Sequence, residues 1–468
     1  MISAGLGFLF WLHGAFGPLP VPVGRFGDVH VYRPFGPVRE TVLLLSDADW
    51  KSAEDDAART LARHGALVMG VDTARYYGLA KPRGCTFAAA DLESMSKQVQ
   101  RGLGVGTYAH PILAGIGAGG RLVYAALAEA PADTFGGAVS AGFCPILRRE
   151  KMLCRGVDLQ WKKPIVGPTV TLLPTRELGN PWFVVPRGET DCSAEVTRTF
   201  VAGVGGAHLL PAPAAGPAGL VAALAGGLDR VAAARPAPAD RGPLPDLPLV
   251  ELLAKRQPLD ALAVIISGDG GWVSLDRKLG RQLAQRGVGV VGIDSLQYFW
   301  SPRSPQGVAS DLARILRHYL KAWNKSSALL IGYSQGADVV PFMAAGLPPD
   351  LRSRVKLVGI IGSDGSARFD RDLDVAITGR SRQEDLPVLP EIAKLGDMHP
   401  VCVFGAQEEE TLCHDLKPGQ VALVEVPGGH DFSGDGGYLA ESFLYEAGLG
   451  PKPSPDDAKP PHRRHGRP

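Results

Sequence analysis

The chain has 468 residues, 45% of them apolar, and its 49 Lys and Arg residues balance 48 Asp and Glu residues. This length predicts two domains of about 200 residues each. The near-neutral charge, with basic residues scattered along the chain, argues against a nucleic-acid-binding protein. The six cysteines form no C-x-x-C pair and no His/Cys cluster with zinc spacing, so we expect no metal site and no cofactor.

Residues 1–20 begin with the apolar stretch MISAGLGFLFWLHGAFG, which we interpret as a leader or an apolar N-terminal arm. The stretch lacks the positively charged start and the small-x-small cleavage site of a secretion signal. It is also shorter than the roughly 20 apolar residues that a membrane-spanning helix needs. We therefore expect a soluble or membrane-peripheral protein.

The first half alternates buried strands with amphipathic helices. Its segments in chain order are ETVLLLSDADW (40–50), AARTLARHGALVMGVDTARYY (57–77), HPILAGIGAGGRLVYAALAEAP (110–131), GGAVSAGFCP (136–145), NPWFVVPRGETDC (180–192) and GGAHLLPAP (205–213). Continuous apolar strands alternating with helices predict a mostly parallel sheet that is covered on both faces.

The second half repeats this order element by element. Its matching segments are ALAVIISGDGGW (261–272), GRQLAQRGVGVVGIDSLQYFW (280–300), ALLIGYSQGADVVPFMAA (328–345), KLVGIIGS (356–363), PVCVFGAQEEETLC (400–413) and QVALVEVPGGHDF (420–432). The chain is therefore predicted to be an internal duplication of one α/β unit.

The boundaries follow from composition. A first unit is expected over residues 21–235, a stiff Pro-rich linker over 236–247 and a second unit over 248–449. The last stretch, 450–468, is polar, of low complexity and expected to be disordered.

The second unit carries a G-x-S-x-G sequence, Gly332 to Gly336, between a predicted strand and a predicted helix. This is the context of a nucleophile elbow, the sharp turn that exposes the serine of α/β-hydrolase-like enzymes. Ser334 is therefore the candidate nucleophile. In the first unit the same turn reads Gly115 to Gly119, with Gly117 at the serine position, so that unit is predicted to be degenerate and catalytically inert.

A serine nucleophile needs a base and an acid, which follow it in this fold in the order Ser, acid, His. His430, in a glycine-rich loop after the last predicted strand, is the candidate base. The acid is expected in the loop after VCVF, with Glu408 first, Glu410 second and Asp364 as a further alternative. In the first unit Glu189, Asp191 and His208 stand at the matching places and are expected to be structural only.

The oxyanion hole needs backbone N–H groups beside the reacting carbonyl. Gln335, the residue after the nucleophile, and Asp269 or Gly270 in the loop SGDGGW are the candidates. The chain has neither G-x-x-x-x-G-K-[ST] nor G-x-G-x-x-G with its acidic partner, which argues against a nucleotide as partner.

The motifs SGDGGW, GVVGIDSLQYFW, GYSQGADVVPF and CVFGAQEEETLC resemble the bacterial VirJ family, and the two-unit layout resembles AcvB-type proteins. The resemblance implies a periplasmic serine hydrolase that removes the amino acid, typically lysine, from aminoacyl-phosphatidylglycerol at the membrane surface. It also implies links to virulence and to type IV secretion-system proteins. The alternatives are another carboxylesterase or thioesterase, and a periplasmic chaperone with an idle site.

An aminoacyl ester carries a cationic amine beside its carbonyl, which carboxylates can bind. Asp338, one helical turn after Ser334, and Asp294, at the end of a predicted strand, are the candidate amine ligands, with Asp269 beside them. Cys402 and Cys413 flank one short loop and are the most plausible disulfide pair.

Overall fold

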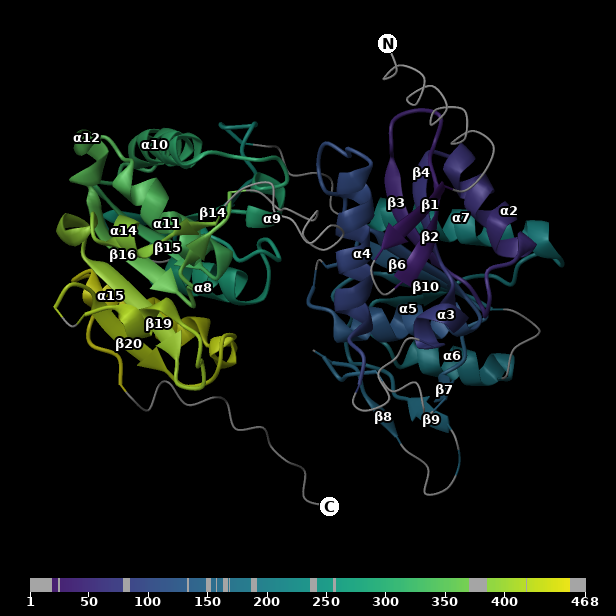
Figure 1. Cartoon of the computed structure of the whole chain (residues 1–468). Coiled ribbons are helices and arrows are strands. Elements are labelled where there is room, and N and C mark those ends of the chain that lie inside the picture. The colour runs from purple at the N-terminus through teal and green to yellow at the C-terminus, as the bar shows by residue number, and fades with distance from the viewer. Residues whose placement is uncertain are drawn as a thin grey trace, which may run out of the picture. The chain divides into compact units, whose positions relative to one another are not determined.

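The structure is a computed structural model that describes residues 19–23, 26–78, 85–132, 134–148, 153–156, 158–162, 167, 169–186, 192–235, 242–255, 258–369, 385–417 and 419–454. The chain forms two compact units, residues 1–237 and 238–468 (Figure 1). Most of the predicted N-terminal arm, half of the predicted linker and residues 455–468 of the predicted tail lie outside the described residues.

The first unit is built on an eight-stranded sheet in the order β1-β2-β4-β3-β5-β6-β10-β11. Its elements are β1 (Leu19–Val23), β2 (Gly27–Tyr32), β3 (Glu40–Leu45), α2 (Ser52–Arg63), β4 (Ala66–Val71), α3 (Thr73–Gly78), α4 (Ala88–Gly102), β5 (Ile112–Ile116), α5 (Ala118–Glu129), β6 (Gly137–Ala141), β7 (Ile146–Arg148), β8 (Trp161–Lys162), β9 (Thr169–Leu172), β10 (Trp182–Val185), α6 (Ala194–Ala202), β11 (Ala207–Leu209) and α7 (Pro217–Ala234). The strands β3 to β6, β10 and β11 run parallel, and the edge strands β1 and β2 join antiparallel.

The second unit has a seven-stranded sheet in the order β12-β14-β13-β15-β16-β19-β20. Its elements are β12 (Leu249–Leu252), β13 (Ala261–Ile266), α8 (Ser274–Gln285), β14 (Gly289–Ile293), α9 (Ser295–Tyr298), α10 (Pro305–Ala322), β15 (Ser327–Tyr333), α11 (Gln335–Ala345), α12 (Pro349–Arg352), β16 (Val355–Ile361), β17 (Ser366–Ala367), β18 (Leu386–Pro387), α14 (Leu389–Ile392), η2 (Gly396–Met398), β19 (Pro400–Gly405), η3 (Leu412–Asp415), β20 (Ala422–Val426), η4 (Phe432–Gly434) and α15 (Gly436–Glu446). Only β12, at the edge, runs antiparallel among the described strands of this sheet.

The two sheets share one strand order once β1 is set aside, with β2 matching β12 and β11 matching β20. Both units are therefore α/β-hydrolase-like, and the predicted fold class and duplication are confirmed. β1 begins at Leu19, so the first sheet takes in two residues that the composition assigned to the N-terminal arm.

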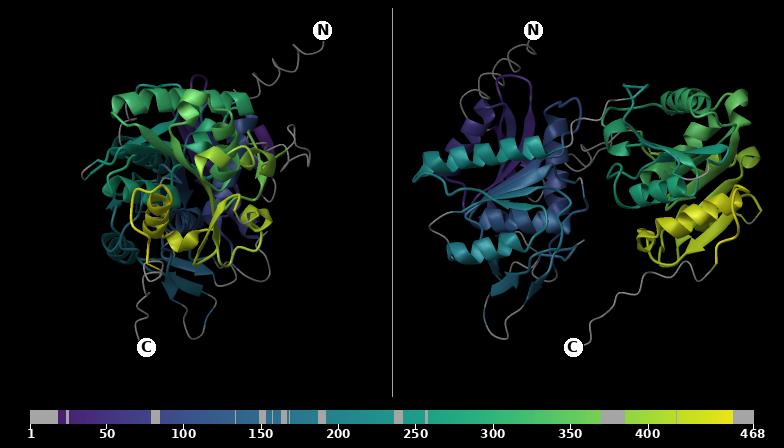
Figure 2. Two further views of the ribbon diagram at one scale, coloured as in Figure 1. Left: turned by 90° about the vertical axis from the view of Figure 1, so that its left-hand side faces the viewer. Right: turned by 180° about the vertical axis from the view of Figure 1, so that it is seen from behind.

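Helices cover both faces of each sheet, as buried apolar strands require (Figure 2). In the first unit α4, α5 and α6 pack on one face and α2 and α7 on the other. In the second unit α10 and α11 cover one face while α8 and α15 cover the other. The central strands are buried on both sides, so their carboxyl ends form the edge where loops can build a site.

Among the described residues one helix, α7, is long and apolar enough to cross a membrane. Its side chains Leu220, Leu224, Leu228 and Val231 pack against β6 and β10 in the core of the first unit. In this fold α7 is therefore the closing helix of a covering layer.

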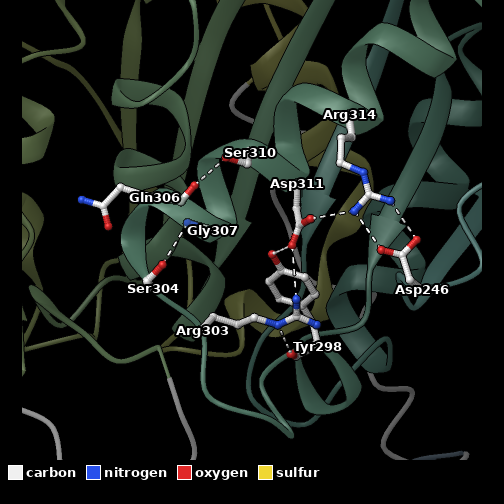
Figure 3. Close-up of polar contacts among 9 residues, drawn as sticks. All are labelled: Asp246, Tyr298, Arg303, Ser304, Gln306, Gly307, Ser310, Asp311 and Arg314. Atoms are coloured by element: carbon white, nitrogen blue, oxygen red, sulfur yellow. Dashed lines mark hydrogen bonds and ion pairs between the residues drawn. The ribbon is translucent and has the colours of Figure 1, made fainter.

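A polar network fixes α10 in the second unit (Figure 3). Asp311 accepts hydrogen bonds from Tyr298 Oη at 2.7 Å and from Arg314 Nη1 at 3.0 Å, and it pairs with Arg303 at 3.3 Å. Arg314 also binds both oxygens of Asp246 at 2.8 Å. The segment that precedes β12 is thereby tied to the covering helix.

Candidate active site

The turn between β15 and α11 has the geometry of a nucleophile elbow. Ser334 lies at φ 51° and ψ −119°, in a region that non-glycine residues rarely adopt. A Cβ on Gly332 would lie 2.1 Å from Gly336 O, and one on Gly336 would lie 2.1 Å from Ile266 O. Only glycine fits at both positions, and this tightness lifts Ser334 to the carboxyl edge of the sheet.

His430 and Glu408 meet at the same edge. His430 Nδ1 lies 2.5 Å from Glu408 Oε1, and Glu408 Oε2 accepts the Gly405 N–H at 3.1 Å. The Glu408 side chain is 7% exposed and that of His430 51% exposed. With the Nδ1 proton held by Glu408, Nε2 of the imidazole is the nitrogen that can take a proton.

The alternative acids have other surroundings. Glu410 is exposed, and Asp364 is exposed and accepts the Ser366 N–H at 3.0 Å. The structure thus brings Glu408, the first of the three predicted acids, to His430.

Tyr333, the residue before the nucleophile, connects the elbow to the histidine loop. Its hydroxyl donates to His430 O at 3.2 Å, and the two rings lie 5.5 Å apart. Ser334 N donates to Ile361 O at 2.9 Å, and a Cβ on the next residue, Gly362, would lie 2.9 Å from His430 Cε1. Serine, imidazole and carboxylate therefore gather where β15, β16 and β19 end.

The loop SGDGGW passes close to the elbow. A Cβ on Gly268 would lie 3.5 Å from Ser334 Cβ, and the Gly271 N–H closes a turn onto Gly268 O at 3.0 Å. The predicted oxyanion donors Asp269 and Gly270 lie inside this turn, and Gln335 begins α11 on the other side of the nucleophile. Two backbone segments thus flank the serine, as an oxyanion hole requires.

Residues 260–448 match the family described as bacterial virulence protein (VirJ). The second unit is VirJ-like. No curated protein matches the chain. Among solved structures, the chain is similar to the ferulic acid complex of Est1E from Butyrivibrio proteoclasticus, at 16% identity and TM-score 0.33, over 43% of this chain and 96% of that chain.

It is also similar to the Bacillus licheniformis lipase BlEst2, at 14% identity and TM-score 0.31, over 42% of this chain and 96% of that one. A third is the thioesterase domain from the curacin biosynthetic pathway, at 15% identity and TM-score 0.30, over 42% and 94%.

The predicted amine ligands of the VirJ-like unit both have partners within the fold. Asp338 is 5% exposed and accepts bonds from Ser363 Oγ at 2.6 Å and Gly365 N at 3.3 Å. Burial is the main cause that raises the pKa of Asp338, to about 8. Asp294 accepts the Gln297 N–H at 3.1 Å, as the N-cap of α9. Their role as amine ligands stays a prediction.

Sequence reasoning missed one acid of the VirJ-like unit. Asp276, in the first turn of α8, is 2% exposed, and its Oδ1 has no hydrogen-bond partner among the described residues. Burial raises the pKa of Asp276 well above its usual range, and nearby Asp294 and Asp269 raise it further. An acid in a first helical turn is ordinary in sequence, so the pattern did not single it out.

The first unit keeps the elbow but blocks it. Gly117 lies at φ 52° and ψ −111°, almost the backbone of Ser334. The following amide, Ala118 N, donates to Asp47 Oδ1 at 2.7 Å, and a Cβ on Gly117 would lie 1.9 Å from that oxygen. A carboxylate therefore occupies the place of the nucleophile and one position of the oxyanion hole.

His208 does not occupy the place of His430. It lies within β11, paired with Phe183 of β10, and its ring stacks on that phenylalanine at 5.0 Å. His430, by contrast, follows the last strand of its sheet. Glu189 and Asp191 lie outside the described residues. No described group of three or more His, Cys, Asp or Glu residues could hold a metal ion.

All six cysteines are paired, as Cys85–Cys154, Cys144–Cys192 and Cys402–Cys413. The last pair is the one expected from sequence. It links β19 to η3 across the loop that carries Glu408, so it braces the loop of the candidate acid.

Proposed function

We propose that the second unit is a serine ester hydrolase in which Ser334 is the nucleophile, His430 the base and Glu408 the acid. The observation that carries this proposal is the 2.5 Å contact between His430 Nδ1 and Glu408 Oε1 at the edge where Ser334 stands on its elbow. The first unit, with Gly117 and Asp47 at the matching places, is inert.

The chemistry follows the roles of the three groups. His430 Nε2 takes the proton of Ser334 Oγ as that oxygen attacks the ester carbonyl. Glu408 stabilises the resulting imidazolium, and N–H groups of Gln335 and of the Asp269–Gly270 turn bind the oxyanion. The imidazolium then protonates the leaving alcohol, and a water activated by His430 hydrolyses the acyl-enzyme.

The substrate that we propose is the aminoacyl ester of phosphatidylglycerol, typically its lysyl form, met at the membrane surface. The resemblance of the sequence motifs to VirJ and AcvB-type proteins, together with the carboxylates Asp269, Asp276 and Asp294 around the site, supports a cationic ester. Three disulfides support an oxidising compartment, and for a bacterial protein of this family we propose the periplasm.

The test is incubation of the purified protein with vesicles that contain lysyl- or alanyl-phosphatidylglycerol. Wild type should release the free amino acid, and Ser334→Ala should not. Ser310→Ala is the matched control, because the hydroxyl of Ser310 bonds within α10, to Gln306 O at 2.9 Å. Release by both variants would exclude Ser334 as the nucleophile.

The same variant separates the alternative functions. A carboxylesterase or thioesterase would cleave simple esters or thioesters through Ser334 and leave the aminoacyl lipids intact. A chaperone for secretion-system proteins would keep its phenotype in cells that carry Ser334→Ala.

A further inference from the structure

The first unit carries an exposed apolar loop at the edge of its sheet opposite the blocked elbow. The loop joins β2 to β3 and reads RPFGPVR, residues 33–39 (Figure 1). Phe35 is 79% exposed, the highest value among the large apolar side chains of the described residues, and Val38 is 40% exposed. A Cβ on Gly36, between them, would meet no atom within 4 Å, so the tip stands in open space. The two prolines of the loop restrict its backbone, so less freedom is lost when the tip binds a partner.

Two other loops lie beside it on the same edge. Residues 101–107, RGLGVGT, follow α4, and Arg33 Nη2 donates to Leu103 O at 3.5 Å. Residues 63–65, RHG, follow α2, and the Arg39 N–H donates to the carbonyl oxygen of the last of them at 2.9 Å. Each of the three loops precedes one of the parallel strands β3, β4 and β5. We therefore call them the amino-edge surface.

The amino-edge surface is basic. Its three loops contain no Asp or Glu and four arginines, which are Arg33, Arg39, Arg63 and Arg101. The first three are exposed, and none of these three forms an ion pair with a described residue. The acid that follows the first loop, Glu40, is paired with Arg235 at 2.8 Å. In a chain whose total charge is near zero, this distribution concentrates positive potential on one edge.

An apolar tip surrounded by arginines fits the surface of an anionic bilayer. Guanidinium groups bind phosphate oxygens through paired hydrogen bonds, and an aromatic ring inserts at the boundary between headgroups and acyl chains. A loop whose tip stands in open space does not form the groove along which a nucleic-acid strand runs. The three disulfides also indicate an oxidising compartment, where nucleic acid is not the expected partner.

The chain enters the first sheet at the same edge. Leu19, the first residue of β1, pairs with Val31, two residues before the loop RPFGPVR. The sequence that precedes β1 contains the apolar stretch of residues 1–17. This stretch is the alternative source of an apolar contact at this edge, so a deletion tests it separately.

We propose that the amino-edge surface docks the chain on anionic phospholipid bilayers, with Phe35 inserted among the headgroups and the arginines of the three loops bound to lipid phosphates. The catalytically inert first unit thereby has a function of its own, which is to keep the second unit at the surface that holds the proposed substrate. This inference goes beyond the proposed function, because docking needs neither Ser334 nor a particular ester.

The experiment measures the partition of the full chain between buffer and vesicles by co-sedimentation. Wild type should bind vesicles of phosphatidylglycerol and phosphatidylcholine at least about tenfold more tightly than vesicles of phosphatidylcholine alone. Phe35→Ser should weaken binding to the anionic vesicles about 10- to 100-fold, because the phenylalanine ring no longer leaves water. Replacing Arg33 and Arg39 by Gln should weaken it about fivefold for each charge. This second effect should disappear as NaCl is raised from about 0.1 M to about 1 M.

Phe87→Ser is the matched control, because Phe87 is 54% exposed at the other end of α4. This variant should leave vesicle binding unchanged. The loop variants should keep the wild-type thermal unfolding and the wild-type kcat for p-nitrophenyl acetate, which is a soluble ester. Ser334→Ala should lose that turnover and keep vesicle binding, so a failure of docking and a failure of the proposed function are distinguishable.

The proposal is overturned if wild type binds both kinds of vesicle equally, or if Phe35→Ser binds as wild type does. Loss of binding on deletion of residues 1–17, but not in Phe35→Ser, would assign the contact to the N-terminal arm. Loss in Leu253→Ser alone would assign it to the second unit, where Leu253 is 66% exposed. A dimer that dissociates in Phe35→Ser, with vesicle binding unchanged, would identify an interface between copies. Each of these three results also overturns the proposal.

Discussion

The blocked elbow of the first unit provides a way to switch off the second. Asp47 follows Ser46, whose Oγ accepts the Thr73 N–H at 2.9 Å, and Gly268 follows Ser267, whose Oγ accepts the Ser295 N–H at the same distance. Gly268 is therefore the counterpart of Asp47. We predict that Gly268→Asp transfers the block to the second unit and abolishes ester cleavage.

The structure sets the expected size of the effect. A Cβ on Gly268 would lie 3.3 Å from Tyr333 Cδ1 and 3.5 Å from Ser334 Cβ, so a small shift of the Tyr333 ring accommodates the new side chain. Its carboxylate can then accept the Gln335 N–H, as Asp47 accepts that of Ala118. Loss of one oxyanion donor costs a factor of about 10² to 10³ in kcat. The negative charge next to the developing oxyanion adds to that loss.

The assay is the turnover of p-nitrophenyl acetate by wild type, Gly268→Asp and Gly268→Ala, with thermal unfolding of all three. Gly268→Ala adds the Cβ without the carboxylate and should keep kcat within about tenfold of wild type, because both backbone donors stay in place. If Gly268→Asp folds and retains more than a tenth of wild-type kcat, the loop does not border the oxyanion hole and the reasoning fails.

Three further predictions concern the acid, the disulfide beside it and the first unit. Glu408→Gln should lower kcat for the same ester by about 10³ to 10⁴, because a neutral amide does not stabilise the imidazolium; a loss below tenfold would assign the role to another carboxylate. Replacing Cys402 and Cys413 by Ser should lower the free energy of urea unfolding of the second unit by about 3 kcal/mol, since the bond closes a loop with a sequence separation of 11. Burial raises the pKa of Glu129 to about 7 from 4.5, so this group stabilises the fold fully below pH 4.5, and the stabilisation is lost as pH rises through 7. The loss amounts to about 3 kcal/mol of unfolding free energy. Glu129→Gln, which keeps an acceptor for the Ala89 N–H, should abolish this difference between the urea unfolding curves at pH 5 and pH 8. Identical pH dependence in wild type and variant would contradict the prediction.

The repeat made the fold predictable, because its signals are local. The strand before Ser334, the helix after it and the glycines on both sides follow from apolar runs and from small residues at fixed spacing. The same pattern around Gly117 predicted the second elbow, and the backbone angles of the two turns agree within about 10°. The disulfide between Cys402 and Cys413 was also predictable, because a short loop joins them.

The sequence ranked Glu408 ahead of Glu410 but did not decide between these neighbouring acids. Glu408 and Glu410 share one loop, and which of them meets His430 depends on how Gly405 and the turn after it direct each side chain. The Asp47 block depends on a contact between residues 71 positions apart. The sequence match that paired His208 with His430 was wrong in space, because glycine-rich segments can be aligned at more than one register and His208 belongs to a strand.

A comparison of the two units distinguishes the residues that maintain the fold from those proposed to take part in catalysis. Trp50 lies over Gly70 as Trp272 lies over Gly292, so closely that a Cβ on either glycine would come within 2.4 Å of the indole. The Gly142 N–H donates to Val185 O on the neighbouring strand β10 at 3.0 Å. The Gly362 N–H donates in the same way to Val403 O on β19, also at 3.0 Å. Such contacts persist where no reaction is expected, so they hold the sheet edge in place and substitutions there should affect stability first.

The two units differ in sequence at three places of the site. These are the nucleophile position, the residue after Ser46 or Ser267, and the loop after the last strand. In the second unit these carry Ser334, Gly268 and His430, and in the first they carry a glycine, a carboxylate and no matching histidine among the described residues. The Asp47 carboxylate accepts the Ala118 N–H at the start of α5. Without it this N–H group would lack a partner, because no oxyanion binds there. With Asp47 bonded to this N–H group, the first unit keeps the elbow geometry around Gly117.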